Sequence, residues 1–311
     1  MSSTALLYHP IYLNHDTGPH HPERPSRLQS ILRKLRKTGL IDRLDAIEPQ
    51  PASTKYIELV HPREHISCIR ELCAKGGGNP DPDTVVSADS YEAALFAAGG
   101  VLTGIDCVIK GKTNNAFCLL RPPGHHARPS QAMGFCLFNN VAIGARYLQK
   151  MHGLKRILII DWDVHHGNGT EEVFCEDPEV FYISLHQYPH YPGTGGGDYI
   201  GKGRGKGFTL NIPMNAGSGD AVYIKVFKDI IMPKIDSYKP EFILISAGFD
   251  GHKDDPLSST TLTESGYYEM TTLLKQAAAS YADNRLVSVL EGGYNLISLA
   301  NSVNYHIEAL C

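Results

Sequence analysis

Short apolar runs alternate with longer helix-like stretches along most of this chain. The short runs have the length and composition of buried strands and cover residues 5–8, 116–120, 157–160, 180–185, 208–212, 242–246 and 286–290. Helices are predicted over residues 24–38, 90–110, 220–238, 263–282 and 296–310. Strands that alternate with helices in this way predict an α/β fold, in which a mostly parallel sheet is covered on both faces.

The chain carries no visible internal boundary. No Pro/Ser-rich linker, low-complexity tract or internal repeat divides its 311 residues, so we predict a single domain over residues 1–311. Hydrophobic residues make up 42% and charged residues 20%, a composition that favours a large core over disorder. The formal net charge of −4 provides no general attraction to nucleic acid or to an anionic membrane, and neither partner is expected.

The terminus and the cysteines indicate a compartment. The first residues lack the basic region and long apolar core of a secretory signal, and no membrane span is expected. The seven cysteines are odd in number and contain no Cys-x-x-Cys pair. They are typical of reduced thiols rather than of a disulfide framework, so we predict a cytoplasmic protein.

Polar residues directly follow four of the predicted strands. These segments are 121–127, 161–169, 246–251 and 291–294. In open α/β sheets, ligands bind beyond the carboxyl ends of the strands, so the four segments are expected to line one crevice. The loops 75–90 and 186–207, rich in Gly, Pro and Asp, are expected to form its rim.

Segment 161–169 carries the strongest chemical signal. Asp163 and His165 alternate at the end of a strand, where both can reach one metal ion, and Asp250 at another strand end can supply a third ligand. Mixed Asp and His ligands suit Zn²⁺ or another borderline divalent metal. Three protein ligands leave a position open for water, as in catalytic sites.

Each signal also has an ordinary explanation when taken alone. The His125-His126 pair is usually surface or satisfied core, Asp161 can bond the backbone at a strand end, and Gly-Gly-Tyr is usually a turn. Asp250 can be the N-cap of a helix. Their joint occurrence at successive strand ends favours one shared catalytic site.

The motifs together resemble the histone deacetylase superfamily over nearly the whole chain, and most closely its class II and bacterial amidohydrolase-like members. They are His-Pro-Glu-Arg-Pro-Ser-Arg-Leu, Pro-Pro-Gly-His-His-Ala, Asp-Trp-Asp-Val-His-His-Gly-Asn-Gly-Thr, Ala-Gly-Phe-Asp and Glu-Gly-Gly-Tyr, in the family's order. The resemblance implies an arginase-like α/β fold with a central, mainly parallel eight-stranded sheet. It also implies one catalytic zinc ion and structural potassium.

The resemblance implies roles for individual residues. The zinc ligands would be Asp163, His165 and Asp250, and the potassium site nearest the zinc would involve Asp161, Asp163, His165, Ser184 and Leu185. The catalytic group would comprise the general base His126, the protonated His125 with its partner Asp161, Asn168 beside His126, and the oxyanion donor Tyr294. The acyl-lysine tunnel would be lined by Gly134, Phe135, Tyr191 and Leu257, with Arg27 beside an internal acetate channel.

Three positions depart from patterns seen elsewhere in that family. Asn168 stands where class I enzymes have a second carboxylate, as in class II, and Tyr191 replaces a phenylalanine common on the tunnel wall. Leu257 stands where polyamine-specific relatives have an acidic residue. This last difference favours acetylated lysine over acetylpolyamine as the substrate.

The resulting expectation is a zinc-dependent deacetylase of acetylated lysine side chains. Its binding partner would be an acetylated lysine peptide or protein, or an acetylated small amine. The alternative is a small-molecule deacetylase that acts on acetylpolyamines or related amides. A two-manganese ureohydrolase is disfavoured because residues 166–168 supply no further carboxylate after His165. A non-enzymatic acyl-lysine binder is disfavoured because the three expected metal ligands and the tyrosine are all present in the sequence. The oligomeric state stays open.

Overall fold

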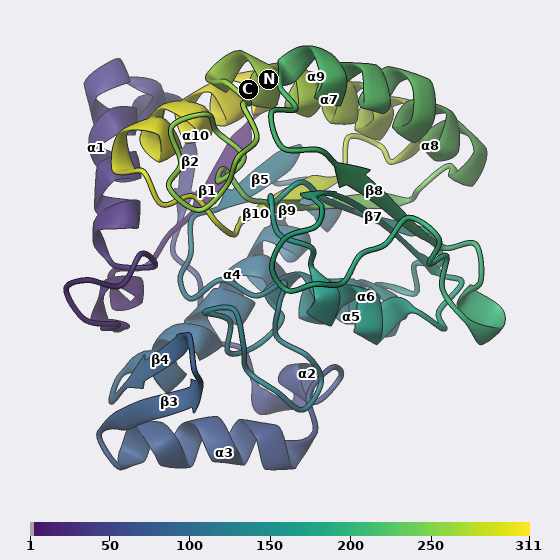
Figure 1. Cartoon of the computed structure of the whole chain (residues 1–311). Coiled ribbons are helices and arrows are strands. Elements are labelled where there is room, and N and C mark those ends of the chain that lie inside the picture. Colours follow the sequence, from purple (N-terminus) through teal and green to yellow (C-terminus); the bar gives the residue numbers. More distant parts are fainter. Residues whose placement is uncertain (1–2) are drawn as a thin grey trace.

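The computed structural model describes residues 3–311, which form an eight-stranded sheet in the order β2-β1-β5-β10-β9-β6-β7-β8 (Figure 1). Every neighbouring pair in this sheet is parallel. The strands are β1 (Thr4–Leu7), β2 (Asp45–Ile47), β5 (Asn115–Cys118), β6 (Ile157–Asp161), β7 (Val180–Gln187), β8 (Thr209–Met214), β9 (Phe242–Ala247) and β10 (Leu286–Leu290). The predicted α/β fold and its eight-stranded sheet are confirmed.

The central strands are buried on both faces, which explains their continuous apolar composition. Their register also aligns the strand ends. Asp161 of β6 pairs with Ser184 of β7 on one side and with Ser246 of β9 on the other. The segments that follow these strands therefore leave the sheet at one edge.

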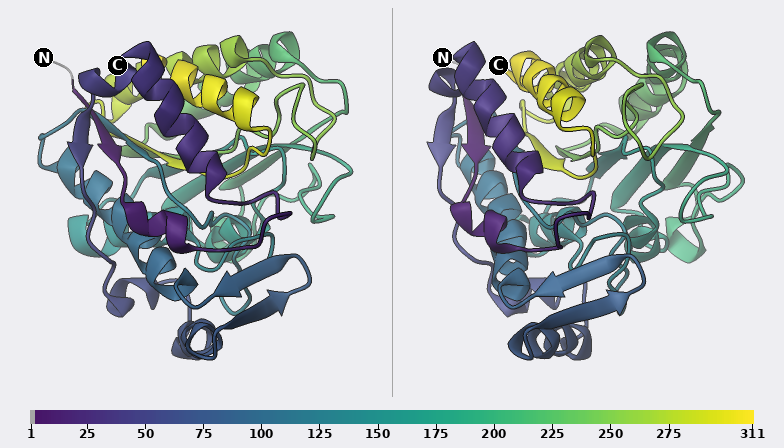
Figure 2. Two further views of the ribbon diagram at one scale, coloured as in Figure 1. Left: turned by 90° about the vertical axis from the view of Figure 1, so that its left-hand side faces the viewer. Right: turned by 60° about the vertical axis from the view of Figure 1, so that its left-hand side comes forward.

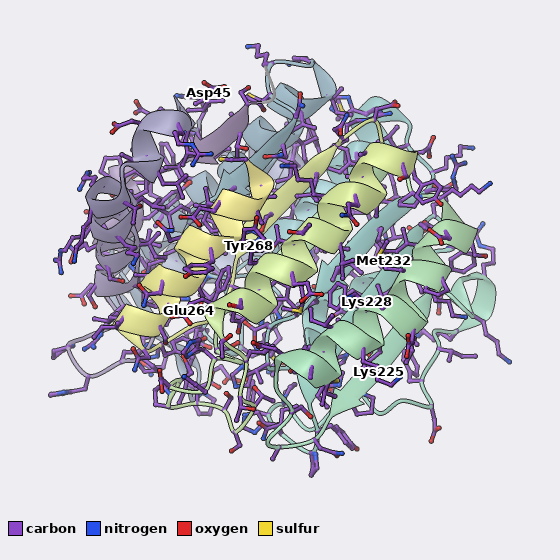
Figure 3. All side chains as sticks on the ribbon, turned by 90° about the horizontal axis from the view of Figure 1, so that it is seen from above. Asp45, Lys225, Lys228, Met232, Glu264 and Tyr268 are labelled. Carbon is purple, nitrogen blue, oxygen red and sulfur yellow. The ribbon has the colours of Figure 1, made fainter. Side chains whose placement is uncertain are left out.

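Two helical layers cover the sheet (Figure 1). The upper layer contains α1 (Ser26–Thr38), α7 (Asp220–Val226), α8 (Met232–Tyr238), α9 (Glu264–Tyr281) and α10 (Leu296–Leu310). Figure 3 shows α10, α9 and the α7–α8 run side by side, with Tyr268 of α9 on the outer surface. The lower layer contains α4 (Ser90–Ile109), α5 (Asn140–His152) and α6 (Asn168–Phe174).

A small outlying unit lies below the lower layer. It comprises α2 (Thr54–Ile57), α3 (Arg63–Ala74) and an antiparallel hairpin of β3 (Gly77–Asp81) and β4 (Thr84–Ser87). Figure 2 shows the hairpin beside α3 at the end of the molecule opposite α10. Residues 75–90, predicted as a loop at the rim, contain this hairpin, which the Gly- and Pro-rich sequence does not signal, and Asp83 between its strands lines the cavity.

Other differences from the predicted elements have local causes. Strand β2 is short, lies at the sheet edge and is largely exposed, so it has no apolar run. The predicted helix 220–238 is interrupted by a π-helical turn, Phe227–Ile231, just before Pro233. Short 3-10 turns occupy Pro10–Asn14, Leu40–Arg43 and Gly203–Gly205.

Helix α4 qualifies as a membrane span by length and composition, contrary to the expectation of no such segment. However, 67% of its apolar window is buried inside the fold. It packs against β1, β5, β10 and α5. A core helix passes the same length and composition test, so α4 is weak evidence for a membrane.

Candidate active site

Three predicted metal ligands meet at the carboxyl edge of the sheet. The side-chain donor atoms of Asp163, His165 and Asp250 all lie within 4.8 Å of one another, and all three residues are buried. His165 Nδ1 lies 3.0 Å from Asp163 Oδ1 and 3.0 Å from Asp250 Oδ2. Two carboxylates fix the turn after β6: the backbone N–H of Asp163 donates to Asp161 at the end of β6, and that of Val164 donates to Asp250, which follows β9.

The electrostatics of this cluster call for a cation. Burial and the adjacent Asp163 carboxylate raise the pKa of Asp250 to about 7. Burial alone would lower the pKa of His165, but Asp163 and Asp250 outweigh it and raise that pKa to about 10. The two buried carboxylates repel each other and stabilise a positive charge beside them. A divalent metal ion would supply that charge, and Asp and His side chains are suitable ligands for it.

Two adjacent histidines lie beside this cluster in different electrostatic surroundings. His125 Nδ1 lies 3.1 Å from Asp161 Oδ2, which also accepts a 3.0 Å bond from the Tyr182 hydroxyl. His126 Nδ1 lies 2.8 Å from Asn168 Oδ1. The two imidazole rings are 4.0 Å apart.

These surroundings separate the protonation states of the pair. Burial opposes a charge on His125, but the Asp163 and Asp161 carboxylates overcome it and raise its pKa to about 10. Burial and the positive charge of His125 hold the pKa of His126 well below its usual range. These shifts favour the imidazolium form of His125 and the neutral form of His126, whose Nδ1–H donates to Asn168 and leaves the Nε2 lone pair available as a base.

A cavity of about 240 Å³ opens over the cluster. Its lining residues are Asp83, His126, Gly134, Phe135, His165, His190, Tyr191, Leu257 and Tyr294. All four predicted tunnel residues and Tyr294 are therefore brought together. A larger hollow of about 830 Å³ lies apart from these residues, over α5 and α6, and its Arg146 and Lys202 are already paired with acidic residues.

The cavity walls are closely fitted to the histidine pair. Gly134 adopts φ +56°, and a Cβ there would lie 2.3 Å from the ring of His126, so only glycine fits. The neighbouring Phe135 also has a left-handed backbone, with φ 69°. Its ring lies 5.8 Å from that of Tyr294, while the Tyr191 ring lies 5.2 Å from that of His126.

The turn that carries Tyr294 rests on buried polar side chains. Arg27 donates through Nε to the Gly293 carbonyl at 2.6 Å, and its guanidinium lies 5.0 Å from the Tyr294 ring. Arg27 is also paired with Glu23, which accepts two bonds from Arg121. The structure thus places Arg27 beside the turn of Tyr294, and its position by an internal acetate channel stays a prediction.

The predicted potassium residues also lie together. Asp161 and Ser184 are adjacent in the register of β6 and β7, and Leu185 follows Ser184 directly. Ser184 Oγ lies 2.9 Å from His186 Nδ1. Binding of potassium at this position stays a prediction.

Sequence reasoning gave no role to several residues that support the site. Glu291 accepts bonds from the backbone N–H groups of Gly124 and His125, and burial raises its pKa to about 7. Its place at the start of the Glu-Gly-Gly-Tyr motif was the available signal. Tyr182, whose hydroxyl donates to Asp161, had none, because this contact depends on tertiary packing.

Comparisons with known proteins agree with this geometry. The histone deacetylase domain matches residues 21–310. A probable deacetylase of Archaeoglobus fulgidus is 44% identical over 295 residues, covering 94% of this chain and 82% of that protein. The human polyamine deacetylase HDAC10 is 39% identical, covering 99% of this chain and 48% of that protein. The crystal structure of the HDA15 HD domain superposes with a TM-score of 0.94 at 38% identity, covering 100% of this chain and 90% of that one.

Proposed function

The chain belongs to the histone deacetylase family, and on that premise we propose that it is a zinc-dependent hydrolase that removes acetyl groups from acetylated lysine side chains. Amide hydrolysis follows from membership of this deacetylase family. The choice of zinc and of lysine rests on the residues around the cavity. The observation that carries the proposal is geometric: the His125 and His126 rings, bonded to Asp161 and Asn168, lie beside the buried cluster of Asp163, His165 and Asp250.

Asp163, His165 and Asp250 would hold the metal ion, because carboxylate oxygens and imidazole nitrogens bind Zn²⁺ and three protein ligands leave one position open for water or substrate. The ion would supply Lewis-acid chemistry, which polarises an amide carbonyl and makes water nucleophilic at neutral pH. Potassium near Asp161 and Ser184 would be structural.

His126 would be the general base and then the general acid. Its Nε2 takes a proton from the water whose oxygen attacks the amide carbon. When the C–N bond breaks, the same proton passes to the leaving nitrogen, which gives a free amine and acetic acid, and the acid ionises to acetate at neutral pH. Asn168 holds the ring with its basic nitrogen free, because the opposite nitrogen donates to the amide oxygen.

Positive charge and a hydroxyl donor would stabilise the transition state. His125 stays protonated because Asp161 and Asp163 surround it, so it supplies positive charge beside the reacting atoms. Tyr294 lines the cavity, and burial raises its pKa well above the usual range, so its hydroxyl remains protonated and can donate to the developing oxyanion. Loss of one such donor costs about 2.7–4 kcal/mol of transition-state stabilisation in other enzymes.

The cavity walls favour a slender alkyl chain. The rings of Phe135 and Tyr191 line it, and Leu257 presents an apolar side chain at the position where an acidic residue would favour a second amine. An acetylated polyamine is the alternative substrate. It is favoured by the Asp83 carboxylate in the cavity lining and by the similarity to a human protein named as a polyamine deacetylase.

Acetate release separates these possibilities. Zinc-loaded protein is incubated with an acetyl-lysine peptide and, separately, with a mono-acetylated diamine, and His126→Ala protein is the blank. We expect turnover of the peptide that is lost in the variant. Turnover of the diamine alone would support the alternative substrate, and turnover of neither would refute the proposed function.

A cytoplasmic location of the protein stays a prediction.

A further inference from the structure

One buried carboxylate bridges the rim of the cavity and the turn that carries Tyr294. Asp255 is only 6% exposed. Its Oδ2 accepts the backbone N–H groups of Tyr294 at 2.7 Å and of Asn295 at 3.2 Å. Its Oδ1 accepts the backbone N–H of Leu257 at 3.0 Å. Both oxygens of Asp255 therefore accept backbone hydrogen bonds.

The Tyr294 turn requires such an anchor. It follows two glycines, and Gly293 adopts φ +121°, a region open to glycine alone. The glycine backbone is held by Arg27, which donates to the Gly293 carbonyl, and by Asp163, which accepts the Gly292 N–H. The next two N–H groups, of Tyr294 and Asn295, have Asp255 as their acceptor. On its other side the chain enters α10, where the Asn295 side chain caps the first turn by accepting from the N–H groups of Ile297 and Ser298. Asp255 joins these two parts by holding two consecutive N–H groups.

The opposite wall of the cavity is tied to the same loop. His190 Nε2 lies 2.9 Å from the Leu257 carbonyl, so the imidazole donates to that oxygen. The backbone N–H of Ser259 donates to the Gln187 side chain at 2.8 Å. Residues 254–259 therefore connect the wall formed by residues 187–191 to the Tyr294 turn, and Asp255 makes the connection to the turn.

We propose that Asp255 is a positioning residue, which sets the Tyr294 hydroxyl over the cavity and fixes it relative to Leu257 at the cavity mouth. The proposal rests on the proposed function, because it assigns Asp255 an effect on the same amide hydrolysis. A carboxylate suits this role because both its oxygens accept hydrogen bonds. An asparagine has one acceptor oxygen and an NH₂ group, which would face a backbone N–H.

The test is a double-mutant cycle of Asp255→Asn with Tyr294→Phe, with kcat and KM measured by acetate release. Asp254→Asn is the matched control, since it makes the same chemical change one residue away. The Asp254 carboxylate lies near His252 and does not contact these N–H groups. We expect Asp255→Asn to lower kcat by about tenfold to a hundredfold with KM nearly unchanged. The double variant should be no slower than Tyr294→Phe alone, because Asp255 acts through the tyrosine.

Two outcomes would overturn the proposal. One is unchanged kcat in Asp255→Asn, and the other is a double variant slowed by the product of the two single effects. If Asp255→Asn protein does not fold, Asp255→Glu, which retains the charge but moves the acceptor atoms, is measured in the same cycle.

Hydrogen exchange gives a readout that does not depend on activity. The amides of Tyr294 and Asn295 should exchange at least about tenfold faster in the Asp255 variant than in wild-type and Asp254→Asn protein. Equal exchange would refute the positioning role. Inactivity of the wild-type protein with faster exchange in the variant would refute only the proposed function.

Discussion

Replacement of Asn168 by Asp tests how the protein keeps His126 basic. The substitution leaves the side-chain shape unchanged and places a half-buried carboxylate 2.8 Å from Nδ1 of the buried His126. An opposite charge at this range raises a pKa by about 1–3 units. The neutral form of His126 is the base, so activity is lost as the pH falls through its pKa. The acid limb of the rate profile should therefore move to higher pH by about 1–3 units.

The assay is the pH dependence of kcat/KM for acetate release, which reports the free enzyme. Asn284→Asp is the control, because Asn284 is exposed and precedes β10, at the sheet edge opposite the site. It adds the same charge and should leave the profile unchanged. An acid limb that does not move in Asn168→Asp protein would refute the assignment of His126 as the base.

Three further predictions concern the oxyanion donor, the cavity mouth and a buried histidine. Tyr294→Phe should lower kcat by about 10²–10³ with little change in KM, and a loss under threefold would exclude it as the oxyanion donor. Leu257→Glu should raise kcat/KM for an acetylated diamine relative to an acetyl-lysine peptide, and an unchanged ratio would show that this residue does not select the substrate. Burial lowers the pKa of His306 to about 3. Below the usual histidine pKa, His306 takes up a proton in the unfolded chain but not in the folded protein, so the stability of the fold decreases as the pH decreases. The free energy of unfolding is measured with urea at about pH 7.5 and at about pH 5. Between these pH values it should decrease by about 2 kcal/mol less in His306→Gln protein than in wild type, and equal decreases would contradict this.

The sequence indicates the fold where local and tertiary preferences agree. The apolar runs that became β6, β9 and β10 were predictable because strands buried on both faces need continuous apolar residues. Strand β2 and the β3–β4 hairpin were not, since an exposed edge strand and a Gly-Pro-rich hairpin have no such pattern.

The candidate site divides in the same way. Asp163, His165 and Asp250 could be proposed because each follows a strand and parallel strands end at one edge. The support from Asp255 and Tyr182 could not, because Asp255 meets Tyr294 across 39 positions and Tyr182 meets Asp161 only through the register of two strands. The protonation states of His125 and His126 likewise depend on burial and on several carboxylates that only the fold brings together.

Metal titration tests the central claim most directly. Zinc is added stepwise to metal-stripped protein, and acetate release from the substrate that is turned over is measured beside bound metal, with Asp250→Asn protein as the comparison. We expect no activity without metal, a rise in activity that saturates at one zinc ion per chain, and neither tight zinc binding nor activity in the Asp250→Asn variant. Full activity in stripped protein, or saturation at two ions per chain, would contradict a single-metal deacetylase built on Asp163, His165 and Asp250.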